Sequence, residues 1–321
     1  MADPVIEAEA VEKRFVTRVK RGRLRRERRV VDAVDGISFA IERGTVVGYL
    51  GPNGAGKSTT VKMLTGILVP SGGRLRVAGL DPSRQRIELA RRIGVVFGQR
   101  SQLWWDLPLR DSFDLLRHIY RVPPERHREN LARFTELLAL APFLDTPVRQ
   151  LSLGQRMRGE LTAALLHDPE IVFLDEPTIG LDVVAKAAVR EFLAEVNRER
   201  GVTVLLTTHD LADIERLCSR LLIIDHGRLI WDGGLDELKR EHGRERTLVV
   251  DLEEPGPPLE LQGARVVRVE GPRQWLSFRR DETSAAELIA AVAARARLLD
   301  VAIEETEIEE IVRRIYAAGA R

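Results

Sequence analysis

The stretch GPNGAGKST, residues 51–59, constrains the fold of this chain more than any other. It follows a short apolar run, 46–50, and it precedes a helical pattern in KSTTVKMLTGIL. Its glycines allow the backbone to wrap so that N–H groups point inward, and Lys57 and a helix N-terminus add positive charge. The Ser58 hydroxyl is placed to bind Mg²⁺. A strand, this loop and a helix together predict a site for the β- and γ-phosphates of a nucleotide in an α/β protein.

Acidic and polar residues follow the later apolar strands. IVFLDEPTIGLD places Asp175 and Glu176 at the end of a buried strand, whose carboxyl end faces the ligand crevice in a parallel sheet. Asp175 can reach the Mg²⁺ shell, and Glu176 is a candidate general base for the attacking water. His209 ends the next apolar strand, and Gln99 follows another apolar run, so we expect both near the same crevice.

The segment VRQLSLGQRMRGEL, residues 148–161, predicts a helix start. Ser152 is a suitable N-cap, Gly154 permits close approach to the backbone, and Gln155 opens the apolar pattern. A helix start offers unpaired N–H groups and partial positive charge to an anion. The segment by itself leaves open which anion this is and whether it is bound by the same molecule.

Periodicity divides the chain into two parts. Strands dominate residues 5–50, helices dominate 110–145, and buried strands alternate with helices from 171 onward, which predicts a parallel sheet covered on both faces. Composition shifts near residue 242, where three strands, a helix, a short strand and a last helix suggest a small α+β appendage.

The net charge, the cysteine count and the distribution of apolar residues exclude several classes of protein. The formal net charge of +1 gives no bulk argument for nucleic acid, and the single Cys218 cannot form an intrachain disulfide. The acidic start MADPVIEAEAVEKRF lacks an apolar core, so we expect no signal peptide. We also expect no membrane-spanning helix, because no stretch of about 18 consecutive apolar residues occurs.

Taken together, the motifs resemble those of the ATPase subunit of ATP-binding cassette (ABC) transporters. GPNGAGKST resembles Walker A, IVFLDEP resembles Walker B, and LSLGQ resembles the signature motif. Gln99 is similar to the Q-loop residue, GLD (180–182) to the D-loop, and His209 to the switch histidine. The match in order and spacing covers roughly residues 5–240. Within the family the chain looks most like the cytosolic subunits of bacterial ABC-2-type exporters, which have separate membrane subunits and an extra C-terminal domain.

The resemblance implies an α/β P-loop NTPase fold. Residues 1–240 are expected to form an ABC cassette with a mixed sheet core, an antiparallel β subdomain and a helical signature subdomain at about 100–160. Residues 241–321 are expected to form a small α+β domain for regulation or assembly. The implied activity is ATP hydrolysis with Mg²⁺, powering a separate membrane permease from the cytoplasmic face of the plasma (inner) membrane, to which the subunit is peripheral.

The resemblance also implies a site shared by two cassettes, a second copy or a paralogue, paired head to tail. The signature helix of one faces the γ-phosphate held by the other. The implied ATP-binding residues are Phe15, which stacks on adenine, and Gly51, Pro52, Asn53, Gly54, Ala55, Gly56, Lys57, Ser58, Thr59 and Asp175. The implied catalytic residues are Glu176, His209 and Gln99, and the implied metal ligands are Ser58, Gln99 and Asp175. The signature residues acting in trans are Leu151, Ser152, Leu153, Gly154 and Gln155, and the D-loop comprises Gly180, Leu181 and Asp182.

Some features depart from the family pattern or keep two interpretations. The common signature has glycine where this chain has Leu153, so the backbone there can face an anion only if that side chain points away. Phe15 suits either adenine stacking or a core. Trp104 and Trp105 are adjacent and cannot both face inward on a regular element, so we expect one exposed toward the permease, or both buried in an irregular loop.

The basic segment 18–29 has three interpretations: a solvated loop, a contact with anionic lipid headgroups, or nucleic-acid binding. No recognised motif supports specific nucleic-acid binding. Alternative functions are a soluble cassette ATPase acting on the ribosome or DNA, and a non-hydrolysing regulatory subunit. A single cassette without a long heptad region favours the transporter ATPase over the first, and Glu176 argues against the second.

Overall fold

The computed structural model describes residues 4–21, 25–98, 101–208, 210–243, 245–279, 281–305 and 308–319. Side chains at 18–21, 25–29, 242, 318 and 319 lie outside this description. The chain divides into two compact units, Met1–Gly233 and Gly234–Arg321. Each unit has its own sheets and hydrophobic core, so each is described by itself.

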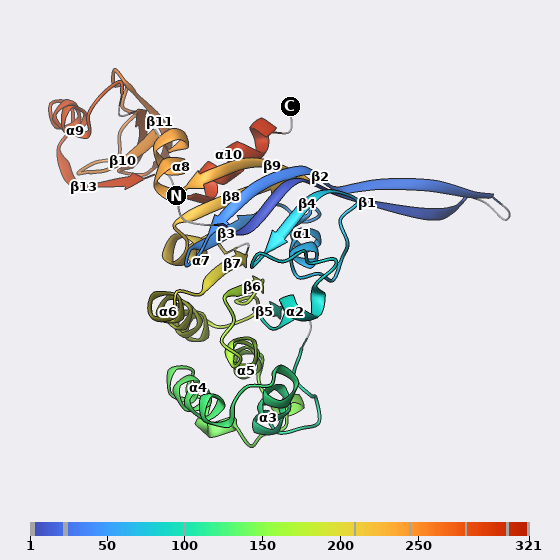
Figure 1. Ribbon diagram of the computed structural model, residues 1–321. Coiled ribbons are helices and arrows are strands. Elements are labelled where there is room, and N and C mark those ends of the chain that lie inside the picture. The colour runs from blue at the N-terminus through green and yellow to red at the C-terminus, as the bar shows by residue number, and fades with distance from the viewer. Residues whose placement is uncertain are drawn as a thin grey trace. The chain divides into compact units, whose positions relative to one another are not determined.

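A six-stranded sheet forms the centre of the first unit (Figure 1). Its order is β5-β6-β7-β3-β8-β9, and the five strands from β5 to β8 run parallel. The strands are β3 (Val46–Leu50), β5 (Ile93–Phe97), β6 (Ile171–Asp175), β7 (Thr203–Thr207), β8 (Arg220–Asp225) and β9 (Arg228–Gly234). β3 and β7 are buried along their whole length, as expected for apolar strands covered on both faces.

Helices cover both faces of this sheet. α6 (Val183–Arg200) and α7 (Leu211–Leu217) lie on one side and α1 (Lys57–Leu64) lies on the other (Figure 1). Side chains of α1 share one hydrophobic core with the central sheet and with a second, antiparallel sheet. Helix α1 therefore stands between the two sheets with its N-terminus at the end of β3.

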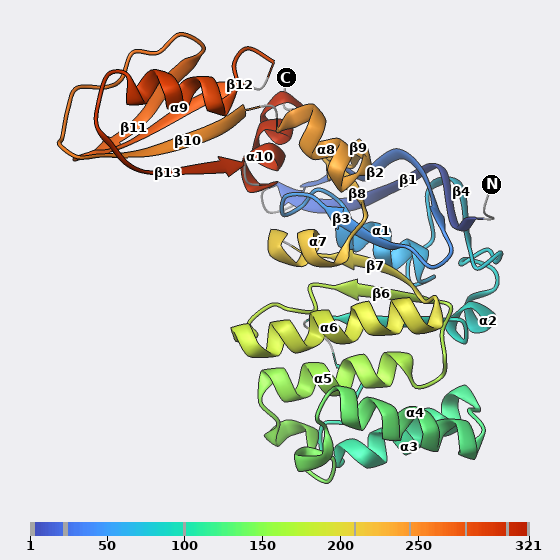
Figure 2. The same ribbon diagram turned by 90° about the vertical axis from the view of Figure 1, so that its left-hand side faces the viewer.

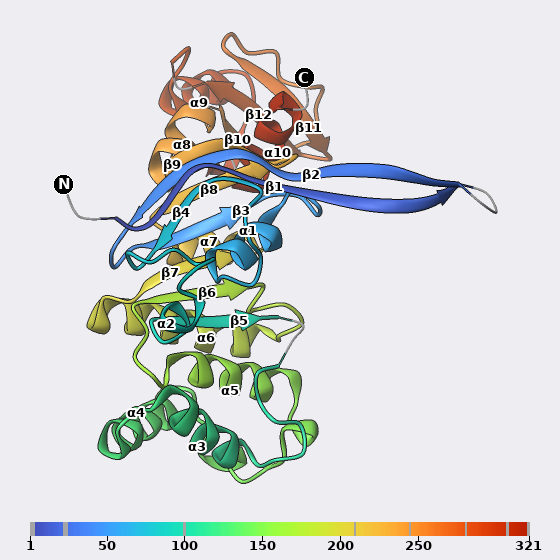
Figure 3. The same ribbon diagram turned by 45° about the vertical axis from the view of Figure 1, so that its right-hand side comes forward.

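The antiparallel sheet contains β1 (Pro4–Arg21), β2 (Arg25–Glu42) and β4 (Gly72–Val77) in the order β2-β1-β4. The basic segment that sequence reasoning treated as a loop by default is strand: pairing continues from Phe15↔Val31 to Arg21↔Arg25. The β-branched residues at the two ends of this segment favour an extended hairpin over a loop. Figure 3 shows this hairpin, here called the β1–β2 arm (residues 16–21 and 25–30), reaching beyond the rest of the first unit.

A helical region follows β5, as the sequence predicted for 110–145. It comprises α3 (Leu109–Tyr120), α4 (Pro124–Leu137) and α5 (Leu153–Leu165), with two 3₁₀ turns at Ala141–Phe143 and Val148–Gln150. Figure 2 shows α5 between α6 and the α3–α4 pair. A short helix, α2 (Arg86–Ala90), precedes β5. Because α5 packs against β5, the helical region is tied to the edge of the central sheet.

The second unit is an α+β structure with a four-stranded antiparallel sheet of order β11-β12-β10-β13. Its strands are β10 (Glu245–Leu252), β11 (Ala264–Glu270), β12 (Arg273–Arg279) and β13 (Leu298–Glu305). Its helices are α8 (Leu235–His242), α9 (Ala285–Ala293) and α10 (Ile308–Gly319). Leu248, Leu276 and Val292, all fully buried, belong to its core, which joins the sheet to α9.

Within the described part of the chain, no helix is both long enough and apolar enough to cross a lipid bilayer.

The candidate nucleotide site

The loop between β3 and α1 requires glycine at its end. Gly56 has φ +111° and precedes the first residue of α1, and a Cβ there would lie 2.5 Å from the backbone oxygen of Ala33. Any larger residue would push β2 away from the loop. The first-turn N–H groups of α1 therefore open toward the cavity in front of them, which is the arrangement that binds phosphate at a helix start.

Lys57 lies inside this loop. Its Nζ donates to the carbonyl oxygens of Gly51, at 2.5 Å, and Pro52, at 3.2 Å. Burial lowers the pKa of the Lys57 ammonium, while the nearby carboxylates of Glu176 and Asp175 act in the opposite direction. The ammonium thus rests on two neutral carbonyls within reach of the cavity, where an anion would be a stronger partner.

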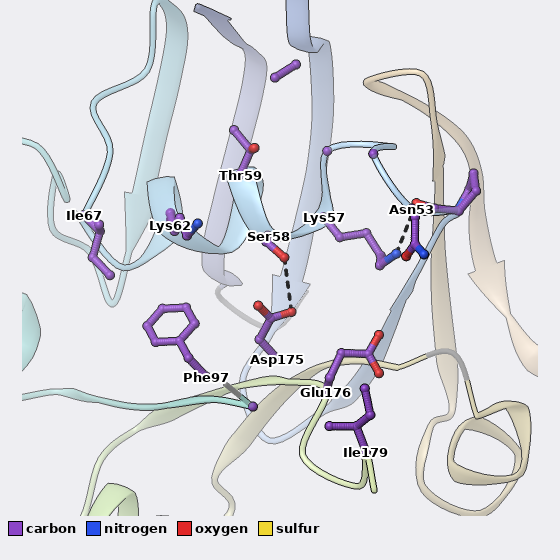
Figure 4. Close-up of a pocket in the computed structure, with 15 residues that line it drawn as sticks. Asn53, Lys57, Ser58, Thr59, Lys62, Ile67, Phe97, Asp175, Glu176 and Ile179 are labelled. Carbon is purple, nitrogen blue, oxygen red and sulfur yellow. Dashed lines mark hydrogen bonds between the residues drawn. The ribbon is translucent and has the colours of Figure 1, made fainter. Parts of the chain in front are cut away.

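Asp175 meets the phosphate loop from the opposite wall. One carboxylate oxygen, Oδ1, accepts hydrogen bonds from Ser58 Oγ at 3.4 Å and from Thr207 Oγ1 at 2.6 Å. Figure 4 shows Ser58 and Asp175 facing each other, with Lys57 beside them. A hydroxyl and a carboxylate so placed are the hard oxygen ligands that Mg²⁺ prefers, so this donor set fits the ion.

Glu176 has an unusual backbone conformation. Its φ is +57°, a left-handed value that is uncommon for a residue other than glycine, and its N–H donates to Thr207 O at 3.0 Å. This turn directs the carboxylate toward the same cavity as Lys57 (Figure 4). Strained residues of this kind cluster at functional sites, because the surrounding structure must hold them in place.

These side chains line one cavity of about 510 Å³. The motif residues that line it are Pro52, Asn53, Gly54, Gly56, Lys57, Ser58, Thr59, Asp175 and Glu176. Sequence reasoning missed the other lining residues, which are Ala33, Lys62, Ile67, Phe97, Gly98 and Ile179. One hint for Gly98 lay in the sequence, because it directly precedes Gln99. The structure shows why this position is glycine: a Cβ there would lie 2.8 Å from Glu176 O and 2.9 Å from Asp175 O.

Phe15 is the residue predicted to stack on adenine. It is not among the described residues that line the cavity. Phe15 is half-buried on β1 with Lys13 Nζ 5.2 Å from its ring centre. The adenine-stacking role of Phe15 stays a prediction.

Gln99 and His209, both predicted site residues, lie outside the described residues. Their neighbours are well placed. Gly98 lines the cavity, and its N–H donates to Asp175 O at 2.8 Å. Thr208 directly follows β7, the strand beside β6, and its hydroxyl donates to the buried Asp213 at 3.2 Å. Gly98 and Thr208 therefore lie at the edge of the sheet where Asp175 lies.

The signature segment forms a capped helix start, as predicted. Ser152 Oγ accepts from Gln155 N at 3.2 Å, and Gln155 Oε1 accepts from Ser152 N at 2.9 Å, which makes a complete capping box on α5. Among the residues that line the cavity within the described chain, none belongs to Leu151–Gln155. This helix start is therefore not directed into the chain's own phosphate site.

The D-loop packs against the signature segment of the same chain. A Cβ on Gly180, which has φ +70°, would lie 2.7 Å from Leu153 Cδ2. Gly154 adjoins Leu181 and Ala185 at ordinary contact distance, and Asp182 caps α6 by accepting from Ala185 N at 2.8 Å. The Leu153 side chain thus packs against Gly180 of the D-loop.

Trp104 and Trp105 are both partly exposed, at 38% and 51%. The guanidinium of Arg156 on α5 lies 5.7 Å from the Trp105 ring centre, within cation–π range. Of the two interpretations, burial of both rings is wrong, because the loop 101–108 leaves an aromatic surface uncovered.

The fold and this cavity define a nucleoside triphosphate-binding α/β protein. Comparison with known proteins narrows the class: the sequence pattern of the ABC transporter family matches residues 34–179. A daunorubicin resistance ATP-binding protein, DrrA3, from Streptomyces coeruleorubidus is 36% identical over 97% of this chain and 95% of its own length. The ABC transporter ATP-binding protein NatA from Bacillus subtilis is 33% identical over 67% of this chain and 87% of its own.

Solved structures agree with these relatives. An ATP-binding subunit of an ABC transporter matches with a TM-score of 0.64 and 26% identity, covering 74% of this chain and 93% of that one. A dimeric ATP-binding cassette in a post-hydrolysis state with ADP and Pi matches with a TM-score of 0.62 and 26% identity, covering 72% and 98%. The chain belongs to the ATP-binding subunits of ABC transporters, which are ATPases that power membrane permeases. The predicted family and fold class are confirmed.

Proposed function

We propose that this chain hydrolyses Mg²⁺–ATP in a sandwich of two cassettes and so drives an export permease at the cytoplasmic face of the plasma (inner) membrane. One observation carries the proposal: Lys57, Ser58, Asp175 and Glu176 converge on a single cavity from two separate elements. Transfer of a phosphoryl group to water requires a loop that binds the phosphates, ligands for Mg²⁺ and a general base, and these four residues can supply all three.

Each residue has a distinct task in this proposal. Lys57 exchanges its two loop carbonyls for oxygens of the β- and γ-phosphates. Ser58 and Asp175 would hold Mg²⁺, which when bound supplies positive charge to the phosphates. Glu176 accepts a proton from the attacking water, and the adjacent positions Gln99 and His209 contact the ion or the γ-phosphate.

The second half of the site comes from a partner cassette. The α5 start lies outside the chain's own cavity, and its capping box leaves the N–H groups of Leu153 and Gly154 without an intrahelical acceptor. A γ-phosphate in another subunit is a suitable anion for them, with Gly180–Asp182 at the same interface. Hydrolysis then depends on assembly, because each site is incomplete in one chain.

The relatives and an exposed aromatic surface support the proposed direction of transport and the proposed partners. DrrA3 is named for daunorubicin resistance, and other similar proteins are Nod factor export ATP-binding proteins, which supports an export permease. Trp104 and Trp105 provide an exposed aromatic surface for that permease. The second cassette is a second copy of this chain or a paralogue, and the second unit, Gly234–Arg321, regulates or assembles the pair.

The β1–β2 arm provides a contact for anionic lipid headgroups. In the backbone register Arg18 pairs with Arg28 and Lys20 pairs with Arg26, so basic residues are paired with basic residues at two positions. Like charges directly opposite each other destabilise a strand pair, and an anionic surface removes this repulsion.

The test separates binding from turnover with two variants of the full chain. Lys57→Ala removes a direct phosphate contact, so ATP affinity falls by about tenfold or more. Glu176→Gln keeps size and ligand geometry but removes the base, so ATP affinity persists while turnover falls by about a hundredfold or more. Fluorescent-nucleotide titration and phosphate release measure the two effects. Wild-type turnover in Glu176→Gln contradicts the assigned base, and unchanged affinity in Lys57→Ala contradicts the assigned site.

A further inference from the structure

Glu160 is a buried carboxylate with no role in the mechanism above. It lies on α5, about two turns after the signature residues, and only 4% of it is exposed. Burial raises the pKa of its carboxyl, and the hydrogen bonds that it accepts oppose this effect. A buried carboxylate is costly unless its oxygens are hydrogen-bonded, so its partners are informative.

Both carboxylate oxygens of Glu160 bind the segment that follows Gln99. Ser101 Oγ donates to Oε1, and the backbone N–H of Gln102 donates to Oε2 at 3.2 Å. The side-chain amide of Gln102 donates in turn to the backbone oxygen of Glu160 at 3.2 Å. Three hydrogen bonds therefore join two consecutive loop residues to one residue of the signature helix.

The same loop has a second, separate anchor. Trp104 N donates to Ser112 Oγ at 3.3 Å, and Ser112 belongs to α3 rather than to α5. Ser112 is fully buried. The loop is thus held to two helices, to α5 through Ser101 and Gln102 and to α3 through Ser112, and the Ser112 contact does not involve the signature helix.

We propose that Glu160 is a positioning residue that makes the segment after Gln99 and the signature helix move as one body. This inference rests on the proposed function, in which Gln99 serves the chain's own ATP and the α5 start serves the partner's. Glu160 then connects the two ATP sites of the dimer through a single chain. Loss of this connection slows turnover and weakens the dependence of one site on the other, while ATP still binds its own phosphate loop.

The experiment compares Ser101→Ala, Glu160→Gln and the double variant with Ser112→Ala as the matched control, all in the full chain. Ser101 is an exposed residue, so its variant folds even if replacement of Glu160 disturbs the core. We expect kcat to fall by about tenfold in Ser101→Ala and Glu160→Gln, with KM for ATP changed by less than about twofold. The double variant falls no further than the more affected single variant, because both changes break one connection.

Two further readouts distinguish positioning from general stability. The Hill coefficient for ATP falls toward about one in the Ser101 and Glu160 variants, whereas Ser112→Ala keeps the wild-type Hill coefficient and kcat. Losses that are equal in Ser112→Ala and Ser101→Ala, or that add in the double variant, overturn the inference. A wild-type chain with no ATP turnover at all contradicts the proposed function instead, so the two failures are distinguishable.

Discussion

Asp175 depends on a hydroxyl from the neighbouring strand. Thr207 Oγ1 donates to its Oδ1 at 2.6 Å, closer than Ser58 Oγ at 3.4 Å. Thr207→Val keeps the side-chain shape but removes the hydroxyl that orients the Asp175 carboxylate. We therefore expect the Mg²⁺ concentration for half-maximal turnover to rise by about threefold to tenfold. ATPase assays across a Mg²⁺ titration measure this shift.

Thr203→Val is the matched control at the opposite end of β7. Thr203 is also fully buried, and its Oγ1 accepts from Gly44 N at 2.8 Å, far along the strand from Asp175. The control loses some stability but keeps the wild-type Mg²⁺ dependence. Equal shifts in both variants would mean that Thr207 supports the strand and not the carboxylate.

Single residues show where sequence reasoning worked and where it could not. Lys57, Ser58, Asp175 and Glu176 were predictable because their motifs fix the local backbone, and local backbone is what short spacings encode. Thr207 and Gly98 were not singled out, because their roles arise from the pairing of β6 with β7 and β5, which is a long-range property. The contact of Leu153 with Gly180 is likewise absent from either segment alone.

Among the elements, the β1–β2 arm differs most from expectation. The basic composition of 18–29 favoured a solvated loop, whereas the β-branched residues Val16, Thr17, Val19, Val30 and Val31 are typical of strands. Charge dominated the interpretation, although residue type at the two ends of the segment was the better indicator of its secondary structure. By contrast, strands and helices from 171 to 218 follow their apolar periods closely, because both faces of that sheet are buried.

The arm allows a direct test of lipid contact. Replacing Arg18, Lys20, Arg26 and Arg28 by Gln should abolish cosedimentation with anionic vesicles, because each basic residue near such a surface contributes about 1 kcal/mol. Four of them amount to about a thousandfold in partitioning. Wild-type binding should also weaken at high salt and be absent with neutral vesicles.

The control replaces four exposed arginines of the first unit outside the arm by Gln: Arg84, Arg91, Arg128 and Arg198. It has the same net charge as the arm variant, so equal loss in both would indicate a bulk charge effect. ATP turnover in detergent-free solution should be the same in both variants, since the arm is remote from the motif residues in sequence and does not line the cavity within the described chain.

At the scale of the whole molecule, nucleotide binding is a property of the first unit, and we expect regulation or assembly to depend on the second. All described residues that line the nucleotide cavity belong to the first unit, and the second unit has its own core. A chain ending at Gly233 should therefore fold and bind ATP within about twofold of the full-length affinity. Its ATP-dependent dimerisation or its activity with the permease should fall. Analytical ultracentrifugation with nucleotide titration checks both parts, and a folded truncation that cannot bind ATP contradicts the division.

The assembly of two chains is tested by Gly154→Asp. The position tolerates the change, because a Cβ there would lie 3.5 Å from Ala185 Cβ and the capping box of Ser152 and Gln155 stays intact. An acid in the first turn also suits the helix dipole. Folding and ATP binding by the single chain should therefore persist. Facing a γ-phosphate across an interface, the same carboxylate is repelled by like charge at a cost of several kcal/mol, so turnover is lost.

Mixing this variant with Lys57→Ala gives the decisive result. Each mixed dimer contains one site with both halves intact, Lys57 from one chain and the unaltered signature from the other. Two inactive proteins should regain part of the turnover, up to the extent that one site works alone. The control is the double variant Gly154→Asp with Lys57→Ala in one chain, mixed with Lys57→Ala: every site there lacks Lys57, so no activity returns. If the first mixture forms dimers and stays inactive, the two sites are strictly coupled or the signature acts elsewhere. ATP binding by the Gly154→Asp monomer decides between these two explanations. Loss of binding would mean that the signature segment contacts the ATP of its own chain.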